Sequence, residues 1–421
     1  MKLAPLLSAA WLAVAAMPGA AEVIERQQSV RPLPGGLDSV LMVNDNNPEL
    51  IDDDGILIST FPDGKAASVP VVLNGRFDLF SHHVYAGDTE GSPSSTLWLA
   101  VLAAPLGNAP VTLQLLSGST SLSQATGPGQ TQAPFLPLPS LMPETTDVVA
   151  SGPGSRVAGD LLAGRRAAEL TNRRWTLAPG APTQLLLLPI PVAGLDPLLN
   201  GRNLQLRFHS SGPVALATLA AHGEDGKAPS EQHWLQLLKD QRMSSKEHQP
   251  TPRGSKGKII YSRVSGVQIG SSWRARITDP GSPVLAAPTA PISWPISSLE
   301  RGTLATNQVQ TAELKRFYPG TAWAAHGNYG VEYDLTLPLK NTGSAAVTLQ
   351  LSLDSPLKGN STTSLLRFRD DLNGPVMFRG PVQTTGLEDS RLHHEQAADD
   401  AEHHLMVRGD GNRAERAAQR Q

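Results

Sequence analysis

Cysteine is absent from the 421-residue chain. This absence excludes disulfide bonds, thiolate metal sites, thiol nucleophiles and a lipid anchor on a cysteine. Charged residues are scarce at 17%, and the formal net charge is only −3. The overall charge therefore gives no argument for binding nucleic acid or acidic lipid. Aromatic residues are also few at 5%, whereas Gly (38) and Pro (35) are abundant. This balance favours short strands and many turns over long helices.

Beyond the N-terminus no apolar run reaches membrane-spanning length, and the leucine run at residues 185–188 ends at Pro189. The first 21 residues form a signal peptide pattern. Lys2 is followed by an apolar stretch, a Pro-Gly pair and small residues, which predicts cleavage between Ala21 and Glu22. We therefore expect a protein that is exported to the periplasm or cell surface, or secreted, and is not inserted in a membrane in its mature form.

An internal repeat indicates the fold class. Residues 107–115 match residues 343–351 at seven of nine positions without a gap. Before each copy, apolar residues alternate with polar ones, which is typical of a strand with one buried face. Each copy predicts a strand, a polar turn and a second strand, forming an antiparallel hairpin of a sandwich.

The sequence as a whole predicts a mainly β protein with two β-sandwich, immunoglobulin-like domains and few short helices. The first domain is expected at 22–226, with a Pro/Gly-rich insertion at 118–173 that could hold a short helix over 155–162. Pro179-Gly180 predicts another hairpin, and residues 210–213 predict a turn. A helix over 228–239, capped by Ser230, opens the helix-and-linker segment 227–257. The second domain, 258–382, lacks counterparts to the last strands of the first.

The tail, residues 383–421, has a different character, because charged residues become frequent and strand alternation disappears. Two explanations remain open. The tail is a disordered appendage, or the reading frame departs from the ancestral one near residue 383. The second explanation would account for the incomplete second domain.

Two acidic residues suggest a cation site. Asp52 and Asp54, followed by Gly55, resemble a fragment of a calcium loop, in which oxygen ligands alternate along the chain. The loop formula is incomplete, and Asp is also common in ordinary turns. Calcium at Asp52 and Asp54 is the one cofactor hypothesis that the sequence offers, and no other metal site is expected.

Histidines precede both repeat copies. His82 and His83 lie three and two residues before Tyr85, and His326 lies three residues before Tyr329. These histidines are the candidates for acid–base catalysis, and Asn328 and Tyr329 are candidate ligand contacts. Because the His-x-x-Tyr spacing recurs, a structural role at a repeated corner is favoured.

Several stretches resemble an uncharacterised family of exported cyanobacterial proteins, a domain of unknown function. They comprise residues 30–38, 47–50, 55–62, 152–157, 325–331 and 335–339. The resemblance covers about residues 25–382 and implies no activity or cofactor. Members of that family continue past residue 381 with apolar strands, and this chain departs there, which favours the frame change.

The sequence leaves two functions open. The leading hypothesis is an exported, non-catalytic envelope protein that binds a protein, a polysaccharide or a wall component. The alternative is a periplasmic hydrolase acting on glycan or peptide, with a site in the loop that begins at His82 and reaches Glu90. A hydrolase requires a concave pocket where carboxylates or histidines from separate strands meet.

Overall fold

The computed structural model describes residues 23–62, 67–88, 95–124, 153–223, 227–247, 249–257, 262–325, 327–349, 351, 356–357, 359, 364–369, 380–385, 392–395 and 406–411. The predicted signal peptide with its cleavage pair Ala21 and Glu22, His326, half of the predicted insertion 118–173 and most of the predicted tail lie outside these residues.

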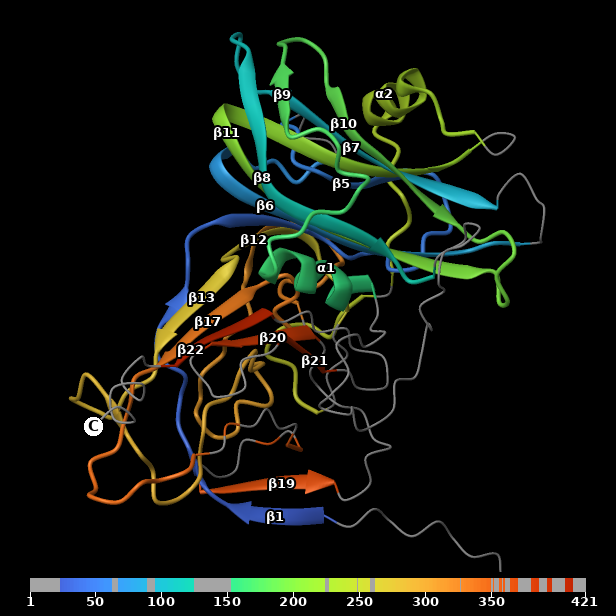
Figure 1. The fold of residues 1–421 in the computed structure, drawn as a ribbon. Helices are drawn as coiled ribbons and strands as arrows, with labels where there is room; N and C mark the ends of the chain where they lie inside the picture. The colour runs from blue at the N-terminus through green and yellow to red at the C-terminus, as the bar shows by residue number, and fades with distance from the viewer. Residues whose placement is uncertain are drawn as a thin grey trace, which may run out of the picture.

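Two bodies are stacked in the molecule (Figure 1). The upper body contains β4 (Leu41–Asp45), β5 (Gly55–Ser59), β6 (Leu73–Ala86), β7 (Thr96–Pro105), β8 (Val111–Leu122), α1 (Pro153–Leu162), β9 (Arg174–Leu177), β10 (Thr183–Pro191), β11 (Leu199–His222), α2 (Glu231–Asp240), β12 (Ser265–Ile269) and β16 (Leu314–Phe317). The remaining strands are β1 (Val23–Gln27), β2 (Ser29–Val30), β3 (Gly36–Leu37), β13 (Ser272–Arg276), β14 (Leu285–Ala286), β15 (Ile292–Ser293), β17 (Glu332–Leu337), β18 (Leu339–Lys340), β19 (Leu365–Arg369), β20 (Gly380–Thr385), β21 (Leu392–Glu395) and β22 (Met406–Gly411).

The strands of the upper body form two layers, and strand β11 belongs to both. Its first arm, from Leu199 to Ser210, pairs with β6 and β8, whereas its second arm, from Val214 to His222, pairs with β7 and β5. The register with β6 shifts between Ser210 and Val214. The turn predicted at 210–213 is therefore a bend inside one long strand, and this bend passes the chain from one layer to the other.

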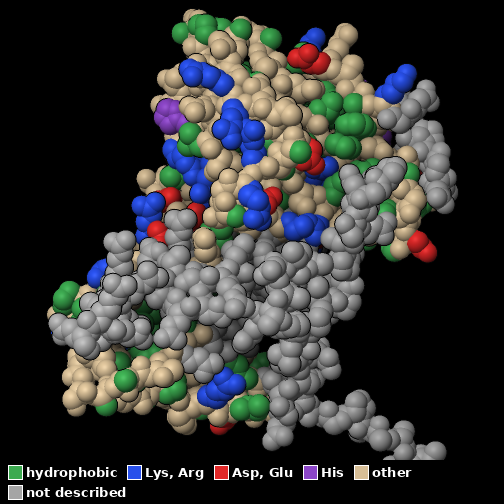
Figure 2. Space-filling model, in the orientation of Figure 1, with side chains coloured by type: hydrophobic (Ala, Val, Ile, Leu, Met, Phe, Trp, Pro, Cys, Tyr) green, Lys and Arg blue, Asp and Glu red, His purple; other side chains and the backbone are tan. Residues whose placement is uncertain are grey.

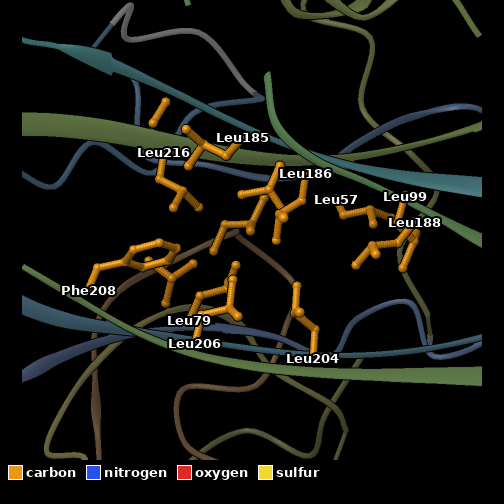
Figure 3. Close-up of a cluster of buried hydrophobic side chains, with 14 of the residues drawn as sticks. Leu57, Leu79, Leu99, Leu185, Leu186, Leu188, Leu204, Leu206, Phe208 and Leu216 are labelled. Atoms are coloured by element: carbon orange, nitrogen blue, oxygen red, sulfur yellow. The ribbon is translucent and has the colours of Figure 1, made fainter. Parts of the chain in front are cut away.

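The main core fills the space between the two layers. Figure 3 shows Leu204, Leu206 and Phe208 of the first arm of β11 facing Leu216 of the second arm, with side chains of other strands between them. Phe208 contacts Phe77 of β6 at a ring-centroid distance of 5.3 Å. Burial of these side chains is the dominant favourable contribution to the folding of this body.

The predicted hairpins of the first copy are wrong. Strand β7 bonds to β10 and β11, whereas β8 bonds to β11 and β9. Likewise β9 bonds to β8, and β10 bonds to β7. The connections 106–110 and 178–182 therefore cross between layers instead of joining paired neighbours. Period-two alternation is the same in both arrangements, because it reports only that one face of a strand is buried.

The second copy of the repeat does not repeat the structure of the first. Val111, Leu113 and Leu115 of β8 are buried in the core. Their counterparts Val347, Leu349 and Leu351 are 50%, 38% and 58% exposed and lie outside any described strand. The hairpin predicted for this copy is thus also wrong in its second strand. The identical residues lack the flanking strands that bury β8.

The lower body is built around β17. This strand pairs in parallel with β13 and with β22, and β22 pairs in parallel with β20. Trp273 and Tyr333 stack at 5.9 Å in its core. The two bodies are joined by polar contacts, since the Gln205 amide donates to the Gly330 carbonyl (2.6 Å). They also share backbone, because β12 pairs with β4 in the upper sheet while β13 follows it in the lower one.

The mainly β class is confirmed, and the two helices are where the sequence predicts them. Ser230 caps α2 and accepts from the His233 amide, and Trp234, Leu237 and Leu238 are its buried residues. The pair of immunoglobulin-like sandwiches is not confirmed, because the sheets are open. Within the described residues, no helix is both long and apolar enough to cross a membrane.

Candidate functional site

A polar hollow lies at one end of the upper body, where the loop 46–54 meets the ends of β6 and β11. The hollow has a volume of about 230 Å³ and is lined by Ile51, Asp52, Tyr85, Ala86, Asp88 and His222. Sheet pairing creates this meeting, because Gly55 lies opposite Ala220 and Leu50 lies beside Val84. Three segments that are far apart in sequence therefore place titratable side chains around one concave surface.

Asp54 and His222 form an ion pair beside the hollow. The Asp54 Oδ1 atom lies 2.7 Å from His222 Nδ1 and accepts from the His222 backbone amide at 3.0 Å. The edge of the imidazole faces the ring of Tyr85, with the centroids 5.3 Å apart. Among the described residues, His222 Nε2 has no hydrogen-bond partner, so this nitrogen is available to a ligand.

The pair shifts the pKa of both members. The hydrogen bond to Asp54 raises the pKa of His222, against partial desolvation, and the charges of Asp54 and Asp88 add to this rise. Burial acts to raise the pKa of Asp54, but the hydrogen bonds and charge of His222 outweigh burial and lower it. Both shifts favour a protonated imidazole beside an ionised carboxylate.

We predict that His222→Gln destabilises the protein more at about pH 5 than at about pH 8. Because the folded-state pKa of His222 is raised, its contribution is fully present below the unfolded value of 6.5. The contribution is lost as the pH rises through the folded value. Melting temperatures of the wild type, His222→Gln and the exposed control His233→Gln would be compared at both pH values. A deficit for His222→Gln that does not change with pH would contradict the prediction.

The carboxylates of the predicted calcium loop differ in their contacts, and two neighbouring ones bond to protein groups. Asp53 Oδ1 accepts from Ser244 Oγ at 3.0 Å and from the Ser245 amide at 2.9 Å, while Asp54 bonds to His222. Asp52 is exposed on the rim of the hollow. In the described part of the chain, no three His, Asp or Glu side chains are grouped to hold a metal ion. Calcium binding at Asp52 and Asp54 stays a prediction.

His83 lies away from the hollow, inside the protein. Its Nδ1 is 2.7 Å from the carbonyl oxygen of Pro48, and its Nε2 is 3.0 Å from Asp45 Oδ2. A carbonyl can only accept, so Nδ1 must donate. Thr218 Oγ1 donates to the same carboxylate oxygen. His83 of β6 thus contacts both the loop 46–54 and β4, and Asp45 of β4 in turn bonds to Thr218 of β11.

His82 is also mostly buried. Its Nδ1 contacts the side-chain oxygen of Asn203, and its Nε2 is 3.4 Å from Glu49 Oε1. Glu49 in turn pairs with Arg263. His82 and His83 therefore flank the interior side of the loop, and neither lines the hollow.

Asn328 and Tyr329 lie where the two bodies meet, away from the hollow. Asn328 Nδ2 donates to the Gln310 carbonyl (2.8 Å) and to Tyr333 Oη (2.6 Å), and its Oδ1 accepts from the Ala312 amide. The ring of Tyr329 stacks on Phe80 at 6.1 Å. Both residues are buried, which fits a role in holding the structure together.

Comparison with known proteins identifies one family. A family described as "Protein of unknown function (DUF3370)" matches residues 28–416. The chain belongs to the DUF3370 family. The match continues past residue 382, through most of the predicted tail. No curated protein and no solved structure matches the chain.

In this DUF3370 protein, the sequence pointed to part of the hollow and missed its centre. The sequence names Asp52, Asp54 and the loop after His82 as candidates. In the structure Asp52 and Asp88 line the hollow, and Asp54 bonds to His222 beside it. His222 was missed because it is 168 positions from Asp54 in the chain. The available signal was its place at the end of an apolar strand, directly before Gly223, where a polar residue interrupts the run.

Proposed function

We propose that the protein is an exported, non-catalytic envelope protein that binds a polysaccharide or wall component through the hollow. The observation that supports this proposal is the group of carboxylates and an imidazole around a concave, solvent-open surface. Carboxylates such as Asp52 and Asp88 accept hydrogen bonds from hydroxyl and ammonium groups, which sugars and amino sugars present. The signal peptide pattern at residues 1–21 supports export.

The size of the hollow favours recognition of the end of a ligand. Its volume of about 230 Å³ is below the range of about 300–1,000 Å³ that is common for sites enclosing a whole small molecule. Such a hollow fits one terminal group of a longer polymer, whose remainder stays outside. Recognition of a chain end requires no catalytic group, and affinity then depends on a few well-placed polar contacts.

The second candidate is a hydrolase, and one observation favours it. His222 Nε2 is available in the hollow, and Asp54 holds the ring from its other nitrogen. A carboxylate that orients an imidazole in this way is a recurring element of general-base catalysis. Among the described residues of the lining there is no Ser or Thr, so the step proposed for His222 is activation of a water molecule.

Sedimentation with purified peptidoglycan tests both candidates. We expect the chain from Glu22 onward to sediment with peptidoglycan, and Asp52→Asn/Asp88→Asn to lose about 90% of this binding, as expected when two hydrogen bonds of about 1 kcal/mol are weakened. The matched control is Glu231→Gln/Asp240→Asn, which removes two exposed carboxylates from α2. Equal loss in the control would contradict the proposal. Release of soluble fragments that His222→Gln abolishes would establish the hydrolase instead.

A further inference from the structure

A line of polar side chains crosses the opposite end of the upper body. Arg174 of β9 lies opposite Gln114 of β8, Gln114 lies opposite His209 of β11, and His209 lies opposite Arg76 of β6. The four side chains are therefore in register across four neighbouring strands. With a strand spacing of about 4.8 Å, the line is about 14 Å long.

Unpaired arginines also precede Arg174 in the chain. Arg173 and Arg174 are exposed, as is Arg166 in the connection between α1 and β9. In the described part of the chain, no acidic side chain forms an ion pair with any of these three. Figure 2 shows Lys and Arg side chains on the visible face of the upper body, with Asp and Glu side chains among them. We call Arg76, Gln114, Arg166, Arg173, Arg174 and His209 the arginine row.

Arg76 lies at the β6 end of the row, close to the charged side chains of Asp78 and Arg207. It bonds to the fully buried Asp78, and Arg207 lies beside it and pairs with Glu332 at 2.7 Å. Burial and the neighbouring charge of Arg207 lower the pKa of Arg76 to about 10, so its guanidinium stays charged at neutral pH. The charges of Arg76 and Arg207 are thus partly neutralised, and most of the free charge comes from Arg166, Arg173 and Arg174.

The arginine row is separate from the hollow. Arg76 and Tyr85 lie on the same strand, nine residues apart, which corresponds to roughly 30 Å in an extended strand. The acidic hollow and the arginine row therefore occupy opposite ends of one sandwich. A ligand of one sign of charge is attracted to one end and repelled from the other.

We infer that the arginine row binds an acidic polysaccharide. Gln114, Arg174 and His209 are exposed in register across three neighbouring strands, which fits a long chain lying across the strands better than an enclosed small molecule. Guanidinium groups pair with carboxylates through two parallel hydrogen bonds, and a polymer with a carboxylate on every sugar presents such groups in a line. This interaction is independent of the ligand of the hollow.

A competing explanation is protection of a sheet edge. In the described structure β9 pairs only with β8, and charged residues on an edge strand prevent two sheets from joining. This explanation assigns the arginines no ligand. It predicts that neutral replacements cause self-association and leave polysaccharide binding unchanged.

Binding of the full mature chain to alginate, measured by biolayer interferometry, tests the inference. We expect Arg173→Gln/Arg174→Gln to weaken binding about tenfold, because two exposed ion pairs are lost. The slope of log affinity against log salt should fall by about 1 or more. The matched control Lys227→Gln/Lys239→Gln removes two exposed positive charges near α2 and should bind as the wild type does.

Four outcomes would overturn the inference. They are no binding of the wild type to alginate at low salt, equal weakening in the control, binding to phosphatidylglycerol vesicles without binding to alginate, and self-association of the double variant, measured by sedimentation velocity, with unchanged affinity. The hollow is tested with a different polymer and different variants, so the two proposals can fail separately.

Discussion

Replacing Phe208 by alanine is expected to lower the free energy of unfolding by about 3–5 kcal/mol. Phe208 is completely buried in the first arm of β11. Its ring lies 5.3 Å from that of Phe77 and 6.3 Å from that of Trp175, and it faces the other layer in the core (Figure 3). Truncation removes apolar contacts and leaves a cavity that the surrounding strands fill only in part.

Urea denaturation measures this effect. Circular dichroism reports the sheets as a whole, and intrinsic tryptophan fluorescence, to which Trp175 beside the cavity contributes, gives a second probe. The control is His209→Ala, at the adjacent exposed position of β11, which should change stability by less than about 0.5 kcal/mol. A loss of less than about 1 kcal/mol for Phe208→Ala would show that the site collapses around the smaller side chain or is not packed as described.

Replacing Asp45 by alanine is expected to destabilise the protein by roughly 2–5 kcal/mol, because two buried groups that face its carboxylate lose their partner, at about 1–3 kcal/mol each. Asp45 is fully buried, and its Oδ2 bonds to Thr218 and faces His83 Nε2 at 3.0 Å. The alanine variant leaves both partners buried without an acceptor. It also removes a negative charge that acts on Lys246, whose pKa burial lowers to about 8.

Two further variants test whether the lost hydrogen bonds cause the loss of stability in Asp45→Ala. Asp45→Asn keeps the size and one oxygen acceptor and should lose less stability than Asp45→Ala. Asp240→Ala removes an exposed carboxylate from α2 and should be nearly neutral. If Asp45→Ala proves as stable as the wild type under urea denaturation, the network around His83 contributes nothing to the fold.

Local sequence signals predicted local structure well. The cap at Ser230 and the spacing of Trp234, Leu237 and Leu238 specify α2, because capping and an apolar stripe act within a few turns. The pairing of strands was not predictable in the same way. The residues of β7 and β8 alternate identically whether the strands pair or cross between layers, so the error lay in the partners and not in the strands.

The repeat shows why sequence identity within a chain does not transfer structure. Residues 111–115 and 347–351 are both Val-Thr-Leu-Gln-Leu, yet within the described part of the chain only the first set is flanked by two strands. Strand formation depends on the hydrogen bonds and contacts that neighbours supply. The distribution of charge was not predictable from the total charge either. A net charge of −3 is compatible with an acidic hollow and an arginine row on the same body.

The connections between the two layers of the upper body differ in length at its two ends. At the arginine row, the short links 106–110 and 178–182 and the bend of β11 all join the two layers. At the hollow, the layers are joined by the longer links 46–54 and 192–198. The shape of the hollow therefore depends on the side-chain contacts that fix the loop 46–54, among them the bond of His83 to the Pro48 carbonyl and that of Asp54 to His222.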